Sequence, residues 1–503
     1  MDLLVNSALI LTFSILWSFW LLIKSSSKTP LLPPGPRGLP IVGYLPFLRK
    51  DLHHQLTELS HRHGPIFKLW LGNKLWIVIS SPSLIKEVLR DQDTIFANRD
   101  ITVAARIATY GLNDIGWSPY GSQWRNLRKI FAREMLSNAN LKATYNLRKD
   151  EVRKAVREIY SKIGTPIDIC ELTMQIDMSL LINLIWGGKI EAERRDKILA
   201  GLLPLVAELV DILIKPNISD FFPVLARFDI QGVAKEATTL LQRADEIIED
   251  TVNERMRNHS ENTLKNEERT DFLQILVDLM QEEDNKASLG KVQLKALLLG
   301  RDVAQRTTIE WVMADLLCHP KVMDKVQQEL NEVVGLNNIV EEFHIPKLEY
   351  LNAVLKETLR VRPIGPFLNP RSPSQSCTVG GYTIPKDSVV FVNVWFVQRD
   401  PQAWDNPSEF RPDRFLGNNG KWDFSGNNFN YIPFGSGRRI CAGLPLAEIM
   451  VRYILASLLH SFEWRLPDGE KLDMSDKLFM TLRKRIPLSA IPAPRLSSSD
   501  LYE

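Results

Sequence analysis

The sequence predicts a mainly α-helical protein with a small β portion. Between residues 122 and 360, long segments such as YNLRKDEVRKAVREIYSKI and VMDKVQQELNEVV place apolar residues at the spacing of amphipathic helices. Apolar and polar residues alternate in KLWLGNKLWIVIS (68–80), which predicts a strand pair around a Gly-Asn turn, and further strands are expected at 376–396. Because no linker or internal repeat divides the chain, we expect one globular domain from residue 45 to residue 503.

The N-terminus carries a separate apolar segment. Residues 3–23 are uncharged and, at about 1.5 Å of rise per residue, long enough to cross the hydrocarbon core of a membrane. Lys24 and Lys28 follow, so the positive-inside rule places the rest of the chain in the cytosol. A cleaved signal peptide is the alternative, but it would have a shorter apolar core and a small-residue cleavage site. We therefore expect a single-pass transmembrane anchor at residues 1–24.

A proline-rich segment follows the anchor. The stretch KTPLLPPGPRGLP lies within residues 25–44. Proline has no backbone N–H and cannot continue a helix, and closely spaced prolines stiffen a chain into an extended form. We expect residues 25–44 to be a hinge between the anchor and the globular domain.

Charge and cysteine content exclude several classes of protein. The net charge is only +2 and the sequence has no long basic run, so we expect no nucleic-acid partner. The four cysteines, Cys170, Cys318, Cys377 and Cys441, lie far apart without a CxxC pair. Their spacing indicates neither a disulfide framework nor a zinc site, which is typical of a domain in a reducing compartment.

One cysteine lies in an unusual setting. Cys441 ends the glycine- and arginine-rich stretch FNYIPFGSGRRIC, just before the apolar segment LPLAEIMVRYILASLL. Positive charge and a helix N-terminus favour a thiolate, and glycines let the backbone pass close to a flat cofactor. Phe434, Gly437, Arg439, Cys441 and Gly443 have the spacing F-x-x-G-x-R-x-C-x-G. This is the haem-thiolate signature, and the chain resembles the cytochrome P450 family. The resemblance implies haem b, with Cys441 as the ligand of its iron.

Three charged residues are candidates for a structural ion cluster. Glu357 and Arg360 share one face of a helix in YLNAVLKETLRVRP, and Arg414 lies in FRPDRF on the way to the cysteine. A buried bidentate cluster of this kind could lock the cysteine loop. The segments resemble the family's E-x-x-R and P-E-R-F elements, although Asp413 replaces the usual glutamate. The alternative is an ordinary exposed pair.

Haem propionates need cationic partners. Trp124 and Arg128 lie four residues apart in WRNLRK, and an indole N–H with a guanidinium suits a carboxylate. They match the family's W-x-x-x-R. The resemblance adds Arg439, Arg371 and Arg99, in that order of preference after Arg128. Each of these, taken alone, could be a surface arginine.

The resemblance also implies a redox partner. A basic face is expected around the cysteine from Arg125, Lys129, Arg133 and Arg438, and it would dock NADPH–cytochrome P450 reductase. The alternative is a charged face that is merely solvated. The chain has no flavin or dinucleotide fingerprint of its own, so electrons from NADPH would come through that separate protein.

The distal helix departs from the family pattern A/G-G-x-D/E-T-T/S. In LLLGRDVAQRTTIEW, Asp302 is a weak candidate for the acid, but the threonine position then holds Val303. Alignment on the later residues instead puts Val303 and Ala304 at the acid and alcohol positions. The stretch is also about four residues shorter than in the family. Because this removes roughly one whole helical turn and rotates the helix faces only a little, a helix across 294–320 could still form. Three explanations of the missing acid–alcohol pair remain open: altered or substrate-assisted proton delivery, non-oxidative haem chemistry, or a fault in the reading of the gene.

The whole chain is similar to plant microsomal enzymes of specialised metabolism. The resemblance implies reductive activation of O₂ and insertion of one oxygen atom into a lipophilic substrate of terpenoid or phenylpropanoid type, at the endoplasmic-reticulum membrane. The alternatives are a haem-thiolate isomerase or dehydratase and a catalytically impaired haem-binding relative. The candidate segments for lining the substrate pocket are residues 101–120, 205–228, 297–308, 364–368 and 478–482.

Overall fold

The computed structural model describes residues 31–187, 191–260, 271–281, 289–299, 304–417 and 421–503. The expected anchor at 1–24 and the first part of the hinge lie outside these ranges. The rest of the hinge turns at residues 40–42 and is bonded to the domain: the Leu31 and Pro34 carbonyls accept from the backbone N–H groups of Thr383 and Lys68, both at 2.8 Å.

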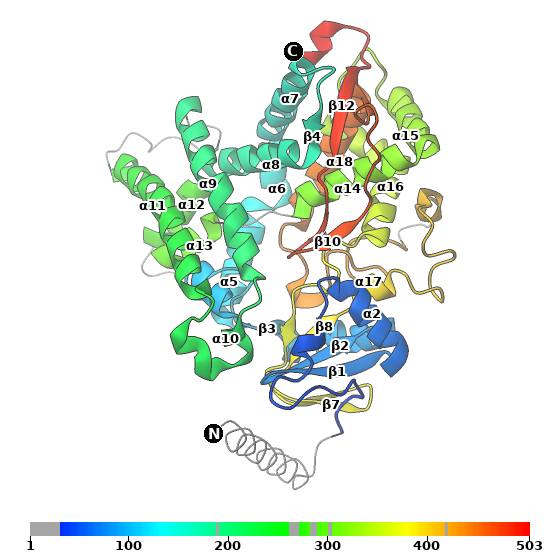
Figure 1. The fold of residues 1–503 in the computed structure, drawn as a ribbon. Helices are drawn as coiled ribbons and strands as arrows, with labels where there is room; N and C mark the ends of the chain where they lie inside the picture. Colours follow the sequence, from blue (N-terminus) through cyan, green and yellow to red (C-terminus); the bar gives the residue numbers. More distant parts are fainter. Residues whose placement is uncertain (1–30, 188–190, 261–270, 282–288, 300–303, 418–420) are drawn as a thin grey trace, which may run out of the picture.

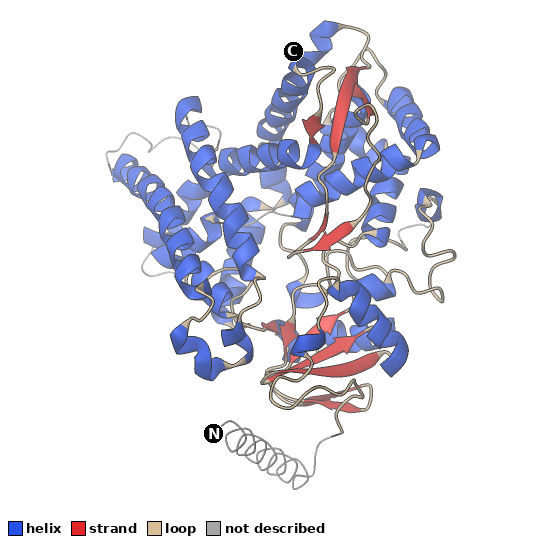
Figure 2. Ribbon diagram, viewed as in Figure 1, coloured by secondary structure: helices blue, strands red, loops and turns tan. Residues whose placement is uncertain are grey.

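Helices make up most of the fold (Figures 1 and 2). The α-helices in the described part of the chain are α2 (Leu52–His63), α3 (Pro82–Lys86), α4 (Val103–Ala108), α5 (Ser122–Ile130), α6 (Asn138–Ala143), α7 (Tyr145–Ser161), α8 (Ile169–Trp186), α9 (Ala192–Leu213), α10 (Ile218–Phe221), α11 (Val233–Ser260), α12 (Phe272–Gln281), α13 (Lys291–Leu298), α14 (Ala304–Cys318), α15 (Pro320–Val333), α16 (Glu349–Val361), α17 (Val394–Val397) and α18 (Leu444–Ser461). Short helical turns are η1 (Leu45–Phe47), η2 (Glu87–Asp91), η3 (Ile95–Ala97), η4 (Phe131–Met135), η5 (Pro223–Phe228), η6 (Glu342–Lys347), η7 (Pro412–Phe415), η8 (Gly437–Arg439) and η9 (Ser499–Tyr502).

The strands are short. They are β1 (Ile66–Leu71), β2 (Lys74–Ile79), β3 (Asn98–Arg99), β4 (Ile167–Asp168), β5 (Arg371–Ser372), β6 (Cys377–Val379), β7 (Tyr382–Ile384), β8 (Val389–Val392), β9 (Phe462–Arg465), β10 (Asp476–Leu478), β11 (Leu482–Lys484) and β12 (Ser489–Pro494).

The largest sheet has five strands in the order β1-β2-β8-β5-β3 and lies at the lower end of the molecule (Figure 2). Its β2–β8 pair is parallel, and its other pairs are antiparallel. A second sheet has the order β4-β12-β9, and β6-β7 and β10-β11 form separate hairpins. The sheets bring segments from both ends of the chain together: β2 near residue 76 pairs with β8 near residue 389.

The predicted elements are largely confirmed, with one error near residue 394. The alternating segment 68–80 forms the antiparallel pair β1–β2, and the two amphipathic segments form α7 and α15. The strands expected at 376–396 are β6, β7 and β8, but residues 394–397 form α17 instead. Asn393 caps that helix by accepting from the Phe396 N–H at 3.1 Å, which ends the strand where the apolar pattern continues.

The main hydrophobic core surrounds α14, α16 and α18. Trp311 on α14 is 0% exposed, and its indole N–H donates to the Leu482 carbonyl of β11 at 2.7 Å. Within the described residues, α8 and α18 are long and apolar enough to cross a membrane, but 67% of each is buried in the fold. Both therefore behave as core helices, and α18 is the helix expected after the cysteine loop.

Candidate active site

Cys441 lies on a tight loop between η8 and α18. Its backbone N–H donates to the Phe434 carbonyl at 3.0 Å, and the Ile440 N–H donates to the Gly437 carbonyl at 3.1 Å. Gly437 has a φ of +66°, and a Cβ there would lie 2.3 Å from the Leu89 carbonyl oxygen, so a side chain cannot be placed there without a shift of the backbone. Cys441 itself is exposed. The loop therefore presents the cysteine at the start of a helix.

Two further residues of the motif, Phe434 and Gly443, have different packing. Phe434 packs edge-on against Phe424, with ring centroids 5.1 Å apart, and so anchors the start of the loop. Gly443 has a φ of −81°, and a Cβ there would meet no protein atom of the described chain within 4 Å. Contacts within the protein therefore require glycine at Gly437, where a Cβ would clash with the backbone.

Three predicted propionate partners converge beside this loop. Arg99 on β3 lies directly opposite Arg371 on β5 in an antiparallel ladder, and Arg439 belongs to η8. Arg371 and Arg439 are 3% and 7% exposed. Burial, followed by repulsion between the arginines, lowers the pKa of Arg99 well below its ordinary value and that of Arg439 to about 10. Like charges at opposed ladder positions repel, so the cluster favours an anionic partner.

Carbonyl groups and one carboxylate hold these arginines in place. Arg99 donates to two backbone carbonyls at 3.2 and 2.6 Å, and Arg439 donates to three. Arg371 donates to the Ser436 carbonyl at 2.9 Å and forms an ion pair with Asp93 at 3.0 Å. Sequence reasoning missed Asp93, because it has no local signal and its partner lies 278 residues away.

Trp124 and Arg128 lie on α5 but have different surroundings. The Trp124 indole N–H donates to the Ile115 carbonyl at 2.9 Å, and the Arg439 guanidinium lies 4.3 Å from its ring centroid. Trp124 therefore uses its donor within the protein and orients Arg439. Burial lowers the pKa of Arg128, and the nearby Cys441 partly offsets this. None of the described residues forms a hydrogen bond or ion pair with the Arg128 guanidinium, which lies within electrostatic range of the cysteine.

The donor set at this place fits haem b. Cys441 offers a sulfur ligand for iron, and Arg128 lies within its electrostatic range. Three arginines, Arg99, Arg371 and Arg439, outnumber the two carboxylates that act on them, which are Asp93 and Asp114. A cofactor that brings two carboxylates would reduce the repulsion and supply charge-assisted hydrogen bonds.

The expected cluster of Glu357, Arg360 and Arg414 is present. Glu357 and Arg360 are both 0% exposed, and Arg360 donates to the two carboxylate oxygens at 2.7 and 2.9 Å. Arg414 Nε donates to the same carboxylate at 3.1 Å. Arg360 also donates to the carbonyls of Gln398 at 3.0 Å and Pro407 at 2.8 Å. The cluster thus ties α16 to η7 and to the loops before it.

Two side chains connect this cluster to the cysteine loop. Gln398 donates to the Leu359 carbonyl at 2.8 Å, and its Oε1 accepts from the Ile432 N–H at 3.2 Å. The Tyr431 hydroxyl donates to the Lys356 carbonyl at 3.0 Å. Both contacts join α16 to the chain that enters the loop, so α16 is a rigid support for it.

Two described helices, α13 and α14, cover parts of the distal segment 294–320. Helix α13 ends at Leu298, and the next described helix, α14, begins at Ala304. Asp302 and Val303, on which the question of the acid–threonine pair depends, lie outside the described residues.

Helix α14 contains buried polar groups that the sequence did not single out. Gln305 donates to Asp177 of α8 at 2.6 Å, and Glu310 accepts from the Leu488 N–H at 2.9 Å. Glu310 is 2% exposed, and burial raises its pKa to about 7, although the Leu488 N–H and Lys484 act in the opposite direction. Glu310 is therefore a buried acid that titrates near neutrality.

Replacement of Arg360 by lysine is expected to destabilise the domain by about 3 kcal/mol. Lysine keeps the charge but cannot contact both carboxylate oxygens and the flanking carbonyls at once. Chemical-denaturation midpoints of the purified protein measure the effect. The control is Lys325→Gln, which removes an exposed ion pair with Asp413 at 3.1 Å and should change stability by less than about 1 kcal/mol. Equal midpoints for Arg360→Lys and the unaltered protein would contradict the structural role.

The raised pKa of Glu310 predicts a pH-dependent stability. Between about pH 4.5 and about 7 the unfolded chain is ionised at this residue while the folded chain is protonated. The unfolded state then binds fewer protons, so the free energy of unfolding falls as pH rises, by on the order of 3 kcal/mol across the window. Glu310→Gln should remove this fall. Denaturation midpoints measured from pH 4.5 to 8 that stay parallel for the two proteins would contradict the assignment.

Comparison with known proteins identifies the family. The family model for Cytochrome P450 matches residues 33–490. A flavonoid 3'-monooxygenase from Crocosmia x crocosmiiflora is 36% identical, over 97% of this chain and 99% of its own, and geraniol 8-hydroxylase from Catharanthus roseus is 37% identical over 93% and 95%. A zebra fish cytochrome P450 structure with progesterone has a TM-score of 0.75 and 25% identity, covering 88% of this chain and 99% of its own. The chain belongs to the cytochrome P450 family of haem-iron monooxygenases.

Proposed function

We propose that this enzyme inserts one oxygen atom of O₂ into a lipophilic small molecule of terpenoid or phenylpropanoid type, with electrons from NADPH delivered by NADPH–cytochrome P450 reductase. The observation that carries the proposal is the exposed Cys441 beside Arg128, within a cluster of buried arginines. The names of two relatives, a geraniol hydroxylase and a flavonoid monooxygenase, support the substrate class.

Individual residues would hold the cofactor. Haem with a thiolate ligand supplies an iron that activates O₂ when electrons arrive. Cys441 would ligate the iron. Arg128 would be the first propionate partner, because its donors are not used by described residues, and Arg439, Arg371 and Arg99 would follow. The latter three donate to carbonyls, so they would act mainly through charge and position.

The protein around the cysteine would keep the site rigid. Glu357, Arg360 and Arg414 would fix α16 against η7. The hydrogen bonds of Gln398 and Tyr431 would connect α16 to the cysteine loop and limit the movement of that loop. A thiolate ligand that cannot shift keeps its distance and orientation constant between turnovers. These residues are positioning residues, since none of them is expected to touch substrate.

A basic surface beside the cysteine supports the choice of reductase. Arg125, Lys129 and Arg133 are exposed on α5 and η4, and the Arg438 side chain is 46% exposed next to Cys441. An acidic flavoprotein would be attracted to this face, where charge raises the rate of encounter. Electrons would then enter from the same side as the thiolate.

A second candidate function is a haem-thiolate enzyme with impaired or non-oxidative chemistry. It is favoured by the sequence of the distal segment, where Val303 or Ala304 stands at the alcohol position of the family pattern. General-acid delivery of a proton requires a donor within hydrogen-bond reach. Asp302 is the weak candidate for that donor, because the neighbouring alcohol is replaced by Val303 in the sequence.

The function is tested first by spectrum and then by turnover. The reduced, carbon-monoxide-bound protein should show the thiolate-type band, and Cys441→Ser should abolish it because a hydroxyl does not replace the thiolate. Arg128→Gln should lower haem retention, whereas Arg125→Gln on the same helix, which is exposed, should retain haem normally. Persistence of the band in Cys441→Ser would overturn the ligand assignment.

Turnover separates the two candidate functions. The enzyme, reductase and NADPH are incubated with geraniol-type and flavonoid-type substrates, and product and peroxide per NADPH are measured. Substrate-dependent NADPH use with an oxygenated product supports the monooxygenase. Product without NADPH supports the non-oxidative enzyme, and peroxide without product supports the impaired relative. A version with a regular acid–threonine helix should couple more tightly if the missing alcohol limits proton delivery.

The enzyme is also proposed to be anchored in the endoplasmic-reticulum membrane by residues 1–24, with the catalytic domain at 45–503 in the cytosol. The apolar span followed by Lys24 and Lys28 supports this orientation. Leu39 and Ile41, which follow the span, have exposed side chains that suit a position near a lipid surface.

Protease treatment of sealed microsomes tests the orientation. A cytosolic catalytic domain should be digested without detergent, while a lumenal marker protein stays intact. Deletion of residues 1–24 should release much of the protein into the soluble fraction. Protection of the catalytic domain in intact vesicles would contradict the proposed topology.

A further inference from the structure

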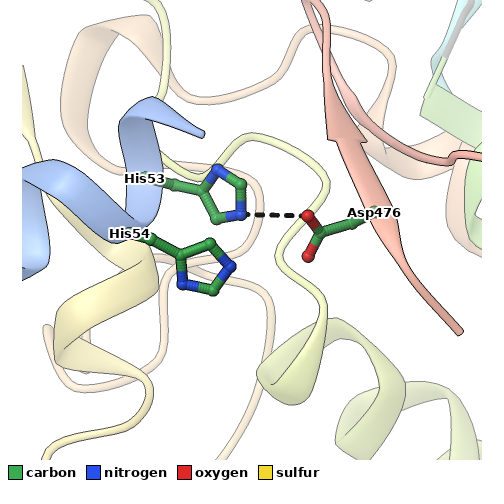
Figure 3. Close-up of side chains that lie close together, drawn as sticks. All are labelled: His53, His54 and Asp476. Atoms are coloured by element: carbon green, nitrogen blue, oxygen red, sulfur yellow. Dashed lines mark ion pairs between the residues drawn. The ribbon is translucent and has the colours of Figure 1, made fainter. Parts of the chain in front are cut away.

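Two histidines and an aspartate lie together far from the cysteine loop in sequence. His53 and His54 belong to the first turn of α2, and Asp476 is the first residue of β10. One nitrogen of each imidazole and one carboxylate oxygen all lie within 4.8 Å of one another. Figure 3 shows both rings on the same side of α2, with Asp476 facing them from the strand.

His53 is the unusual member of this cluster. It is 1% exposed, yet neither of its ring nitrogens forms a hydrogen bond with any residue that the structure describes. Its Nε2 lies 3.2 Å from Asp476 Oδ1, which is an ion-pair distance without hydrogen-bond geometry. Buried polar atoms are normally satisfied, so an unsatisfied imidazole that faces a carboxylate indicates a missing partner.

The separation of His53 and Asp476 is compatible with two ligands of one metal ion. Zinc lies about 2.0–2.1 Å from imidazole nitrogen and about 2.0–2.2 Å from carboxylate oxygen, so tetrahedral neighbours are roughly 3.3 Å apart. The 3.2 Å between His53 Nε2 and Asp476 Oδ1 matches that edge. The His54 side chain is exposed and can rotate to close the remaining separation. Its exposure also provides a path for a hydrated ion.

We propose that His53, His54 and Asp476 bind a divalent cation of the zinc class, with water completing the coordination. Two imidazoles and one carboxylate form a donor set that is typical of zinc sites with an open position. This open site differs from a closed four-ligand structural site, which the cysteine spacing of the chain does not provide.

Groups next to His53, His54 and Asp476 limit the affinity of this site for a divalent cation. The His53 and His54 rings lie 4.6 and 5.2 Å from the ring of Trp395, which shields one side of the site from water. The Arg399 guanidinium, 3.3 Å from the Trp395 ring centroid, lies within electrostatic range of His54 and Asp476. This cation opposes a second positive charge, so we expect weaker binding than at a closed structural site.

Binding would join the two ends of the chain. Asp476 pairs with Lys484 in the β10–β11 hairpin, whose Leu482 carbonyl accepts from Trp311 of α14. A cation held by α2 and β10 would therefore fix the base of a hairpin that packs on the core. Because it binds only the folded arrangement, it should stabilise the protein.

The test is zinc titration of the full-length, detergent-solubilised holoprotein without a polyhistidine tag, after removal of metals by a chelator. Calorimetry should show one zinc equivalent that is lost or weakened at least tenfold in His54→Ala and in Asp476→Asn. Both changed residues retain some exposure, so these variants are expected to fold. The control is His61→Ala, an exposed histidine on the same helix, which should bind zinc as the unaltered protein does.

Two further readouts make the outcome decisive. An unchanged haem spectrum in each variant shows that it is folded, and zinc should raise the melting temperature of the unaltered protein but not of Asp476→Asn. X-ray absorption of the zinc-loaded protein should report two imidazole ligands and an oxygen shell. Absence of stoichiometric binding, or equal zinc affinity in either ligand variant, would overturn the proposal. Because the haem spectrum is measured separately, this failure is distinguishable from a failure of the proposed oxygenase function.

Discussion

The buried ion pair between Glu357 and Arg360 supports the part of the fold that carries the cysteine. Moving both charges out of water is costly, and the cost is offset here because the guanidinium contacts both carboxylate oxygens and the carbonyls of Gln398 and Pro407. Arg414 adds a second cation to the same carboxylate. Loss of one member would leave an uncompensated buried charge, so these contacts hold α16 and the loops that follow it together.

The region beside Cys441 carries positive charge that its carboxylates do not neutralise. Arg99 and Arg371 face each other in a ladder, and Arg439 joins them, with Asp93 as the carboxylate that pairs directly with one of them. Carbonyl groups hold these side chains in place but do not neutralise them. The protein therefore maintains a positive site that gains stability when an anionic cofactor binds, and this couples cofactor binding to folding.

Two other buried polar groups also carry a cost of burial that a bound proton or ion would reduce. Burial raises the pKa of Glu310 to about 7, and His53 is buried with unsatisfied nitrogens beside Asp476. A core built for stability alone would hold apolar residues at such positions. Each of these groups marks a place where the fold tolerates a cost, and a bound proton or ion would reduce it.

Much of the fold followed from the sequence, because periodicity is a local property, and motif spacing, which is also local, singled out Cys441 as the candidate iron ligand. The alternating pattern predicted β1–β2, and the glycine- and arginine-rich spacing singled out Cys441. The strand predicted beyond Val392 was wrong, because a cap at Asn393 turns a continuous apolar run into a helix. Pairings between distant residues, such as Asp93 with Arg371 or His53 with Asp476, were decided only by tertiary structure. The sequence around a charged side chain does not indicate which distant residue it will pair with. The pairing depends on which segments the packed core brings together.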